Sequence, residues 1–298
     1  MGFAIDQAVG VVVPALNAEE RLGAILERLE EQTLAPVDVL VVDSASTDGT
    51  VEVARSFQGV RVVSIDRESF NHGLTRDKAF RNVAGDYVCF LTDDAIPSSN
   101  SFLEDLLDPF ADSRVAMVSG RQLPKSDARE FERLVRRYNY PDKSNVRDKS
   151  DLEKLGIKTF FASDACSAYR RTAYEAIGGF REVNTNEDML IAAQLIHRGY
   201  KIAYAAKATV YHSHNLTLRQ QYARNMEIGF FLESHAEELA YESEVREGSR
   251  LVSMVLRELV RERRYIELTA FVADCAARFL GNRAGRLGAR REKKSYCR

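Results

Sequence analysis

The chain has 298 residues, of which 45% are hydrophobic and 29% charged, and this composition fits a globular protein with one large domain or one domain and an appendage. The net charge of −2 is unevenly distributed: residues 250–298 hold 13 Lys and Arg against 5 Asp and Glu, a net charge of +8, and the rest of the chain carries −10. The acidic body argues against nucleic acid as a partner of the main domain, whereas the basic end suits an anionic membrane surface.

Targeting signals are not evident in the sequence. There is no hydrophobic N-terminal segment of the secretory kind and no run of about 18 uncharged apolar residues. Met1-Gly2 is followed by Asp6 where a myristoylation signal needs Ser or Thr. The cysteines lack metal-ligand spacing and are expected to be reduced thiols: Cys89, Cys166, Cys275 and Cys297. These features predict a cytoplasmic protein.

The first 120 residues alternate between short apolar runs and segments with helical spacing. Such alternation predicts βαβ units and a mostly parallel sheet with right-handed crossovers. We expect strands at residues 9–13, 37–42, 60–65, 87–91 and 115–119, and helices at 18–31, 47–57, 75–84 and 101–110.

The alternation stops after the fifth strand. Residues 123–158 are polar and charged with few apolar repeats, which predicts a mobile or ligand-dependent excursion. From residue 218 the pattern is helical almost to the end, with Gly281, Gly285 and Gly288 expected to loosen the last stretch. Between these regions we expect strands at 159–169, 201–205 and 209–211 and an amphipathic helix at 188–198.

Two adjacent aspartates follow the apolar strand at 87–91. Asp93 and Asp94 are costly to hold together unless a cation or hydrogen-bond donors compensate them. In open α/β sheets, ligands bind at the carboxyl ends of the strands. We therefore expect a hard metal ion and a polar ligand at this point. The alternative is an Asp-rich turn that caps the next helix.

A third carboxylate, Asp43, ends the second strand in the same way and is placed to accept hydrogen bonds from a ligand. The first strand leads into residues 13–20, where a dinucleotide-binding fold needs Gly-x-Gly-x-x-Gly. Those glycines are absent, which argues against an NAD or FAD enzyme.

Several motifs, taken in order, resemble one enzyme family. Val-Pro-x-x-Asn at residues 13–17, Val-Val-Asp-Ser-x-Ser-x-Asp-Gly-Thr at 41–50 and Leu-Thr-Asp-Asp at 91–94 resemble the nucleotide-sugar half of glycosyltransferase family 2. The likeness continues to about Gly229. Four further motifs resemble the bacterial rhamnosyltransferase branch: Phe-Asn-His-Gly-Leu-Thr-Arg at 70–76, Gly-Arg-Gln-Leu-Pro at 120–124, Asn-Glu-Asp at 186–188 and Val-Tyr-His-Ser-His-Asn at 210–215.

The resemblance implies an α/β GT-A fold, in which helices flank a mostly parallel central sheet and a helical extension follows. It divides the chain into a nucleotide-sugar-binding half (residues 1–120), an acceptor-binding and catalytic half of the same domain (121–217) and a C-terminal helical extension with a basic tail (218–298).

The resemblance also implies a nucleotide-sugar donor and a bound Mg²⁺ or Mn²⁺ that offsets the charge of the diphosphate leaving group. We assign Asp94 to the metal and Asp93 to the ribose or to a supporting role at the metal. Arg76 is expected to meet the base or the diphosphate; the alternative is a charge on a helix surface. The residues expected on the nucleotide-sugar side are Pro14, Leu16, Asn17, Asp43, His72, Arg76, Asp93, Arg121 and Gln122.

Glu187 and Asp188 open the helix at 188–198. Carboxylates in a first turn favour the positive end of the helix dipole, so capping alone explains them equally. The resemblance places the inverting general base here, and we assign Asp188, with Glu187 supporting it. Such a base removes a proton from the acceptor hydroxyl as it attacks the anomeric carbon, in one displacement without a covalent intermediate.

His212 and His214 alternate on a short strand, so both side chains point to one face. A single histidine is more often structural, but two of the chain's five on one face favour a role near the diphosphate. Either can complete the metal shell as a neutral imidazole, and we favour His212. Asp164 follows an apolar segment and is expected to line the sugar or acceptor pocket, or to form an ordinary turn.

The leading hypothesis is an inverting, metal-dependent transfer of L-rhamnose from dTDP-L-rhamnose to a bacterial surface polysaccharide carried on a polyprenyl diphosphate. A UDP-hexose donor and an inactive GT-A-like binding protein are the alternatives. The apolar stripe after residue 250 is expected to pack on the body or on a second subunit. The closing Lys and Arg residues are expected to bring the enzyme to the inner leaflet, each contributing roughly 1 kcal/mol near the surface.

Overall fold

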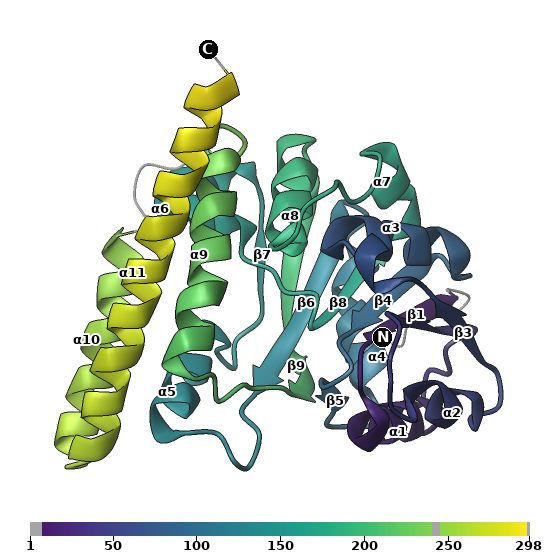
Figure 1. Ribbon diagram of the computed structural model, residues 1–298. Coiled ribbons are helices and arrows are strands. Elements are labelled where there is room, and N and C mark those ends of the chain that lie inside the picture. The colour runs from purple at the N-terminus through teal and green to yellow at the C-terminus, as the bar shows by residue number, and fades with distance from the viewer. Residues whose placement is uncertain (1–7, 240–244, 297–298) are drawn as a thin grey trace.

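The computed structural model describes residues 8–239 and 245–296. At its centre lies a nine-stranded sheet in the order β3-β2-β1-β4-β8-β6-β9-β5, with β7 pairing to β9 outside this path (Figure 1). The strands are β1 (Val9–Ala15), β2 (Asp38–Asp43), β3 (Val60–Ser64), β4 (Tyr87–Leu91), β5 (Ile96–Pro97), β6 (Val115–Leu123), β7 (Asn145–Arg147), β8 (Cys166–Arg170) and β9 (Lys201–Tyr211).

The first four strands form the parallel half of the sheet. β1 pairs in parallel with β2 and β4, and β2 with β3. Side chains alternate between faces: Val11 and Val13 pack among α1 and α4, whereas Val12 packs among α3 and α8. The predicted βαβ units are confirmed. Their helices are α1 (Glu19–Glu30), α2 (Thr50–Arg55), α3 (His72–Asn82) and α4 (Phe102–Leu107).

The other half of the sheet is mixed rather than parallel. β8 is antiparallel to β4 and β6, and β9 is parallel to β6 but antiparallel to β5 and β7. The two short strands expected at 201–205 and 209–211 are one strand, β9, whose register against β6 shifts after Gly120. The strand expected at 159–169 is wrong in its first part, because β8 begins at Cys166.

Seven further α-helices and four short 3-10 helices complete the described chain. The α-helices are α5 (Glu130–Asn139), α6 (Leu152–Leu155), α7 (Arg171–Ala176), α8 (Glu187–His197), α9 (Leu218–Ser234), α10 (Val245–Arg261) and α11 (Tyr265–Tyr296). The 3-10 helices are Arg67–Ser69, Asp108–Ala111, Lys149–Asp151 and Gly156–Phe160.

The mobile excursion expected at 123–158 is instead a folded connection that contains α5. Phe131, Leu134 and Val135 recur at helical spacing and are buried against Val255 on α10 and Phe271 on α11. The partners of this apolar stripe lie more than a hundred residues further along the chain. The polar residues around the stripe made this helix hard to predict, because its stability comes from packing against segments far along the chain.

Close backbone contact joins α9 and α11, which lie side by side (Figure 1). A Cβ atom on Gly285 of α11 would lie 1.9 Å from the backbone oxygen of Met226 on α9, and one on Gly229 would lie 2.1 Å from the backbone oxygen of Asn282. The expectation that glycines loosen this stretch is wrong: α11 continues through Gly281, Gly285 and Gly288, and the first two let the helices touch.

Among the described residues, no helix has the length and apolar character needed to cross a bilayer. Cys89 and Cys166 are buried free thiols, and Cys275 is a partly buried free thiol. Cys297 and the Met1-Gly2 segment lie outside the described residues.

The contact between α9 and α11 predicts a position-specific effect of adding one methyl group. Gly285→Ala should lower the free energy of unfolding by about 1–3 kcal/mol, because the new Cβ meets backbone that cannot move aside without separating the helices. Gly248→Ala on α10 meets nothing within 4 Å and should raise it by about 0.5–1 kcal/mol. Thermal unfolding of both variants checks this; equal melting temperatures would contradict the close contact.

Candidate functional site

The carboxyl ends of β1, β2 and β4 meet at one edge of the sheet. Asp93, just after β4, accepts hydrogen bonds through Oδ2 from the backbone amide of Leu16 at 3.2 Å and from Arg21 Nη2 at 2.8 Å. Asn17 has a left-handed backbone (φ 47°), and its Oδ1 accepts a hydrogen bond from the amide of Thr47 at 2.9 Å. The loops after β1 and β2 are thereby fixed to each other and to β4.

A cleft of about 700 Å³ opens beside this edge. It brings together nine of the predicted site residues: His72, Arg76, Asp93, Asp94, Asp164, Glu187, Asp188, His212 and His214. Four other predicted residues do not line it: Pro14 and Asp43 lie at the carboxyl ends of β1 and β2, and Leu16 and Asn17 lie in the loop after β1. Asp43 is buried at the end of β2 and accepts a hydrogen bond from the amide of Ser46 at 3.2 Å.

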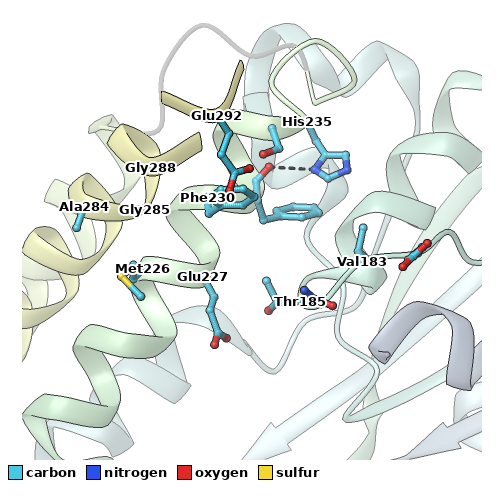
Figure 2. Close-up of a pocket in the computed structure, with 14 residues that line it drawn as sticks. Val183, Thr185, Met226, Glu227, Phe230, His235, Ala284, Gly285, Gly288 and Glu292 are labelled. Carbon is cyan, nitrogen blue, oxygen red and sulfur yellow. Dashed lines mark hydrogen bonds between the residues drawn. The ribbon is translucent and has the colours of Figure 1, made fainter. Parts of the chain in front are cut away.

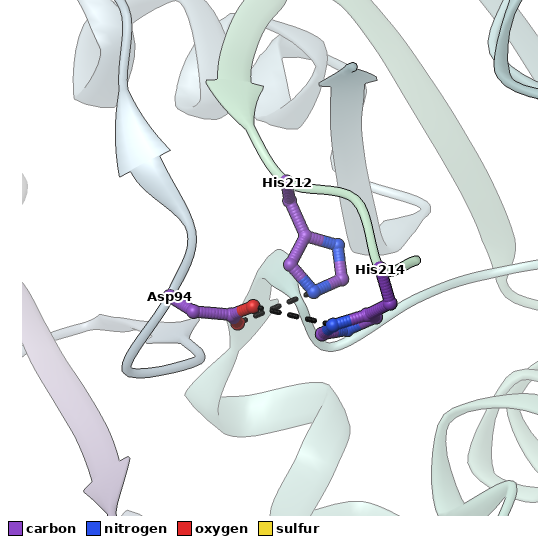
Figure 3. A group of neighbouring side chains, drawn as sticks. All are labelled: Asp94, His212 and His214. Atoms are coloured by element: carbon purple, nitrogen blue, oxygen red, sulfur yellow. Dashed lines mark ion pairs between the residues drawn. The ribbon is translucent and has the colours of Figure 1, made fainter. Parts of the chain in front are cut away.

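Asp94, His212 and His214, called the Asp-His-His cluster below, point toward one another (Figure 3). His212 Nε2 lies 3.3 Å from Asp94 Oδ1, and His214 Nδ1 lies 3.7 Å from Asp94 Oδ2. One ligand atom from each side chain falls within 4.8 Å of the others. The end of β9 brings the two histidines to the turn after β4, because β5, which follows that turn, pairs with β9 at Tyr211.

The tautomer of His212 fits a bound cation. Its Nδ1 lies 2.8 Å from Gln122 Oε1, which also accepts a hydrogen bond from Arg136, so Nδ1 carries the proton and Nε2 presents a lone pair. Burial lowers the pKa of His212 and lowers that of His214 to about 4, which keeps both rings neutral near pH 7. A lone pair then faces a carboxylate oxygen across 3.3 Å, an arrangement that a metal ion stabilises.

Three carboxyl groups surround the buried guanidinium of Arg76 on the opposite side of the cleft. Arg76 Nη1 lies 3.0 Å from Glu187 Oε1, and Arg76 Nε lies 3.7 Å from Asp164 Oδ2. Arg76 is 5% exposed, so the alternative of a surface charge is wrong. Asp188 is partly exposed to the cleft and accepts a hydrogen bond from the amide of Met189 at 2.7 Å.

Burial and mutual repulsion favour protonation of these acids. Burial raises the pKa of Asp164 to about 6, with Arg76 opposing and Glu187 reinforcing the shift. Burial also raises the pKa of Asp188 well above its usual value, and the charges of Glu187 and Asp164 add to this effect. A carboxylate of raised pKa is a stronger base than an ordinary one.

Two polar atoms at this wall have no hydrogen-bond partner among the described residues: Arg76 Nε and Asp164 Oδ2. The other oxygen of Asp164 accepts hydrogen bonds from Ser167 at 2.6 Å and Tyr169 at 2.7 Å. Buried polar atoms without partners are rare, and they are expected where a polar ligand binds.

The cleft contains three cations that the sequence did not single out. Lys125 Nζ lies 3.2 Å from Asp94 Oδ2, Arg21 pairs with Asp93, and Arg224 of α9 lines the cleft from the C-terminal side. Lys125 directly follows the motif at 120–124, and Arg21 lies four residues after Asn17. Their closeness to these motifs could have predicted both as site residues. Arg224 had no such signal.

Arg121 and Gln122 lie outside the cleft wall formed around Arg76. Arg121 Nε donates to the backbone oxygen of Tyr140 at 3.2 Å. The Gln122 side chain is buried between His212 and Ser163, to whose hydroxyl its Nε2 donates at 2.8 Å. Their predicted contacts with the donor remain predictions.

Comparison with known proteins identifies the family. The sequence model described as glycosyl transferase family 2 matches residues 10–178. The chain belongs to glycosyltransferase family 2. It is therefore a glycosyltransferase, and the predicted enzyme class is confirmed.

Two relatives of this transferase come from Salmonella. The O-antigen chain rhamnosyltransferase RfbN of Salmonella typhimurium is 40% identical over 225 residues, which cover 75% of this chain and 72% of RfbN. The O-antigen chain rhamnosyltransferase WbaN of Salmonella anatum is 42% identical over 224 residues, covering 74% and 71% respectively. These relatives confirm the predicted resemblance to the rhamnosyltransferase branch.

A solved structure confirms the GT-A-like fold of the transferase. The mannosyltransferase PcManGT from Pyrobaculum calidifontis, in complex with GDP-Man and Mn²⁺, superposes with a TM-score of 0.61 at 17% identity, covering 96% of this chain and 88% of that one. At this identity the likeness concerns the fold alone.

The hydrogen bond from His212 to Gln122 predicts an effect on metal affinity. Gln122→Leu removes the acceptor that fixes the His212 tautomer, and Mn²⁺ affinity should fall about 10–100-fold. Gln122→Glu keeps an acceptor oxygen and should stay close to the original affinity. Electron paramagnetic resonance of free Mn²⁺ measures both. Unchanged Mn²⁺ affinity in a folded Gln122→Leu variant would show that Gln122 does not support metal binding through His212.

Proposed function

We propose that this transferase is an inverting, metal-dependent rhamnosyltransferase that moves L-rhamnose from dTDP-L-rhamnose to a growing bacterial surface polysaccharide on a lipid carrier. The two Salmonella relatives support the sugar and the polymer, since both are named as O-antigen chain rhamnosyltransferases. The observation that carries the proposal is the cleft, where the Asp-His-His cluster, whose ligand atoms are close enough to share one cation, faces Asp188, a carboxyl group of raised pKa.

In this proposal the Asp-His-His cluster holds a divalent cation, which would offset the negative charge of the departing diphosphate. Two imidazoles favour Mn²⁺ over Mg²⁺, because Mg²⁺ strongly prefers oxygen ligands. Lys125 and Arg224 line the same cleft and add fixed positive charge for the phosphates. Asp93 and Asp43 lie toward the expected nucleotide end, near the loops after β1 and β2.

Asp188 is the proposed general base. Glu187 is held by Arg76 at 3.0 Å and is 7% exposed, which leaves Asp188 as the acid with access to the cleft. Its raised pKa suits removal of a hydroxyl proton, and the turnover rate should fall as pH drops through that pKa because the base becomes protonated. Asp164, whose amide donates to Asp188 Oδ2 at 3.3 Å, is proposed to line the acceptor side.

The proposed roles follow the chain. Residues 1–120 supply the nucleotide-sugar side, 121–217 supply the metal histidines and the base, and 218–298 form the helical extension. This division is supported by the positions of the cleft residues, with Arg224 as the contribution of the extension.

A donor panel tests the proposed function. With Mn²⁺ present, dTDP should be released from dTDP-L-rhamnose, whereas UDP-glucose and UDP-galactose should yield no UDP. Asp188→Asn should reduce transfer by at least about a hundredfold and leave Mn²⁺-dependent dTDP binding intact, since general-base catalysis contributes about 10²–10⁴. Release of UDP alone would show that the donor is a UDP-sugar. Turnover without divalent metal would contradict the proposed metal dependence. Full activity of Asp188→Asn would show that Asp188 is not the general base.

Peripheral membrane contact is also proposed, through the outer face of α11. The side chains of Tyr265, Val272 and Phe279 recur every seven residues, and Phe279 and Leu280 are 66% and 57% exposed. Arg283 lies one turn beyond Phe279 on the same face and is exposed. Exposed apolar side chains beside positive charge suit an anionic bilayer surface.

Part of the basic tail has another role. Arg290 pairs with Glu233 of α9 at 2.7 Å, and Arg286 and Lys293 also contact this glutamate. These residues join α11 to α9 and are not counted as membrane ligands in the proposal.

Vesicle sedimentation tests this face. The transferase should bind vesicles of phosphatidylglycerol more tightly than phosphatidylcholine, and added salt should weaken the binding. Phe279→Ser combined with Leu280→Ser should weaken it about tenfold or more, whereas Val37→Ser, 56% exposed before β2, should not. Equal binding by all three proteins would overturn the proposal. Loss of a dimer in sedimentation analysis, with vesicle binding unchanged, would assign the face to a homo-oligomer.

A further inference from the structure

A second cavity of about 620 Å³ lies between α9, α11 and the segment before α8 (Figure 2). We call it the α9–α11 groove. One wall carries Met226 and Phe230 of α9, which are 42% and 36% exposed, and Val183 and Thr185 stand across from them. The floor is formed by small residues of α11: Ala284, Gly285 and Gly288.

The groove continues into the catalytic cleft. Asn184, Thr185 and Glu227 line both cavities. Residues 182–185 lead directly to Asp188, so a molecule in the groove extends to the wall that carries the proposed base. This connection lies on the side of the cleft away from the loops around Asp93, where the nucleotide is expected.

The segment that forms the far wall is held firmly in place. Asn71 Oδ1 accepts a hydrogen bond from the amide of Val183 at 3.3 Å, and Asn71 Nδ2 donates to Asn184 Oδ1 at 2.9 Å. The amide of Gly73 donates to the backbone oxygen of Val183 at 3.2 Å. Because α3 fixes this wall, the groove is preorganised relative to Arg76 and the acids beside it.

The groove lacks the fixed cations of the cleft. It is lined by the exposed carboxylates of Glu182, Glu227 and Glu292, and its described lining contains neither Lys nor Arg. In the cleft, Arg21, Arg76, Lys125 and Arg224 stand among the carboxyl groups. A diphosphate therefore finds cationic partners in the cleft and like charge without Lys or Arg in the groove.

Neutral sugars match the chemistry of the groove. A pyranose ring has an apolar face of C–H groups that can lie on the Phe230 ring, and its hydroxyl groups can donate to carboxylates. An acyl or polyprenyl chain matches the apolar wall but leaves the three carboxylates desolvated without donors, which is unfavourable.

We propose that the α9–α11 groove binds the neutral sugar units of the acceptor that precede the unit being extended. The inference rests on the proposed function, because it takes the acceptor to be a saccharide chain. The reacting sugar lies at Asp188, and the next one or two units lie along Phe230 and Met226. The groove thus selects acceptors by the sugars behind the reacting end.

The sequence contains no tryptophan, so one introduced indole reports on the groove alone. Phe230→Trp keeps an aromatic ring at the proposed stacking position. Its fluorescence should shift on titration with neutral di- and trisaccharides built from L-rhamnose, D-mannose and D-galactose. dTDP with Mn²⁺, and farnesyl diphosphate, should leave it unchanged. Phe279→Trp, on the outer face of α11, is the matched control and should respond to none of these probes.

The kinetic counterpart uses Phe230→Ala. With a trisaccharide acceptor that shifts the Phe230→Trp signal, the acceptor KM should rise about tenfold, whereas the KM for dTDP-L-rhamnose and the rate of donor hydrolysis should stay the same. A silent Phe230→Trp signal across the sugar panel, or a response to farnesyl diphosphate alone, would overturn the inference. Failure of the proposed donor is distinguished from this, because it abolishes dTDP-L-rhamnose hydrolysis and leaves the sugar-induced fluorescence shift intact.

Discussion

The buried guanidinium of Arg76 allows three carboxyl groups to share one wall of the cleft. Asp164 comes from the loop before β8, and Glu187 and Asp188 from the start of α8, so the acids arrive from two distant parts of the chain. Without a cation between them their mutual repulsion and burial would oppose folding. Arg76 offsets part of this cost, and the remainder appears as the raised pKa of Asp164 and Asp188. Arg76 thus stabilises the wall, while burial and the neighbouring acids keep the pKa of Asp164 and Asp188 raised.

The transferase separates its charges by position. Donor atoms for a cation, and the fixed cations Lys125 and Arg224, occur where a diphosphate is expected. The described lining of the groove holds carboxylates and neither Lys nor Arg, and uncharged sugars are expected there. The GT-A-like sheet accounts for this arrangement. Its parallel strands end where the nucleotide is expected, and β9 in its mixed half leads into the two histidines. A linear acceptor then approaches from the side of the C-terminal helices.

The parallel half of the sheet and the strand-end acids were predictable because local patterns determine them. The run at 87–91 is apolar at every position and is buried at every position, and it leads directly into Asp93 and Asp94. What local patterns lack is the identity of distant partners. Gln122 was expected at the donor, and nothing in its local pattern indicated its hydrogen bond to His212, which lies 90 residues away.

The same limitation explains the errors in the C-terminal half. α5 is polar in composition, and its apolar stripe becomes meaningful only against α10 and α11. Glycine in a helix indicates either flexibility or close approach, and sequence alone does not distinguish them. Gly285 serves close approach, because the backbone of α9 occupies the position that a Cβ atom would take. Arg224 of α9 reaches the cleft from the same helix, which packs on α11 and, through Phe231 and Leu232, on the core of the domain.

Asp93 and Asp94 are neighbours in sequence, yet their carboxylates face different partners. Asp93 binds the loop after β1 through Leu16 and Arg21, and Asp94 faces the two histidines at the end of β9. In the proposed function, one peptide bond separates the residue on the nucleotide side from the residue that holds the cation. Any effect of the cation on nucleotide affinity is then matched by an equal effect of the nucleotide on cation affinity, because thermodynamic linkage is reciprocal.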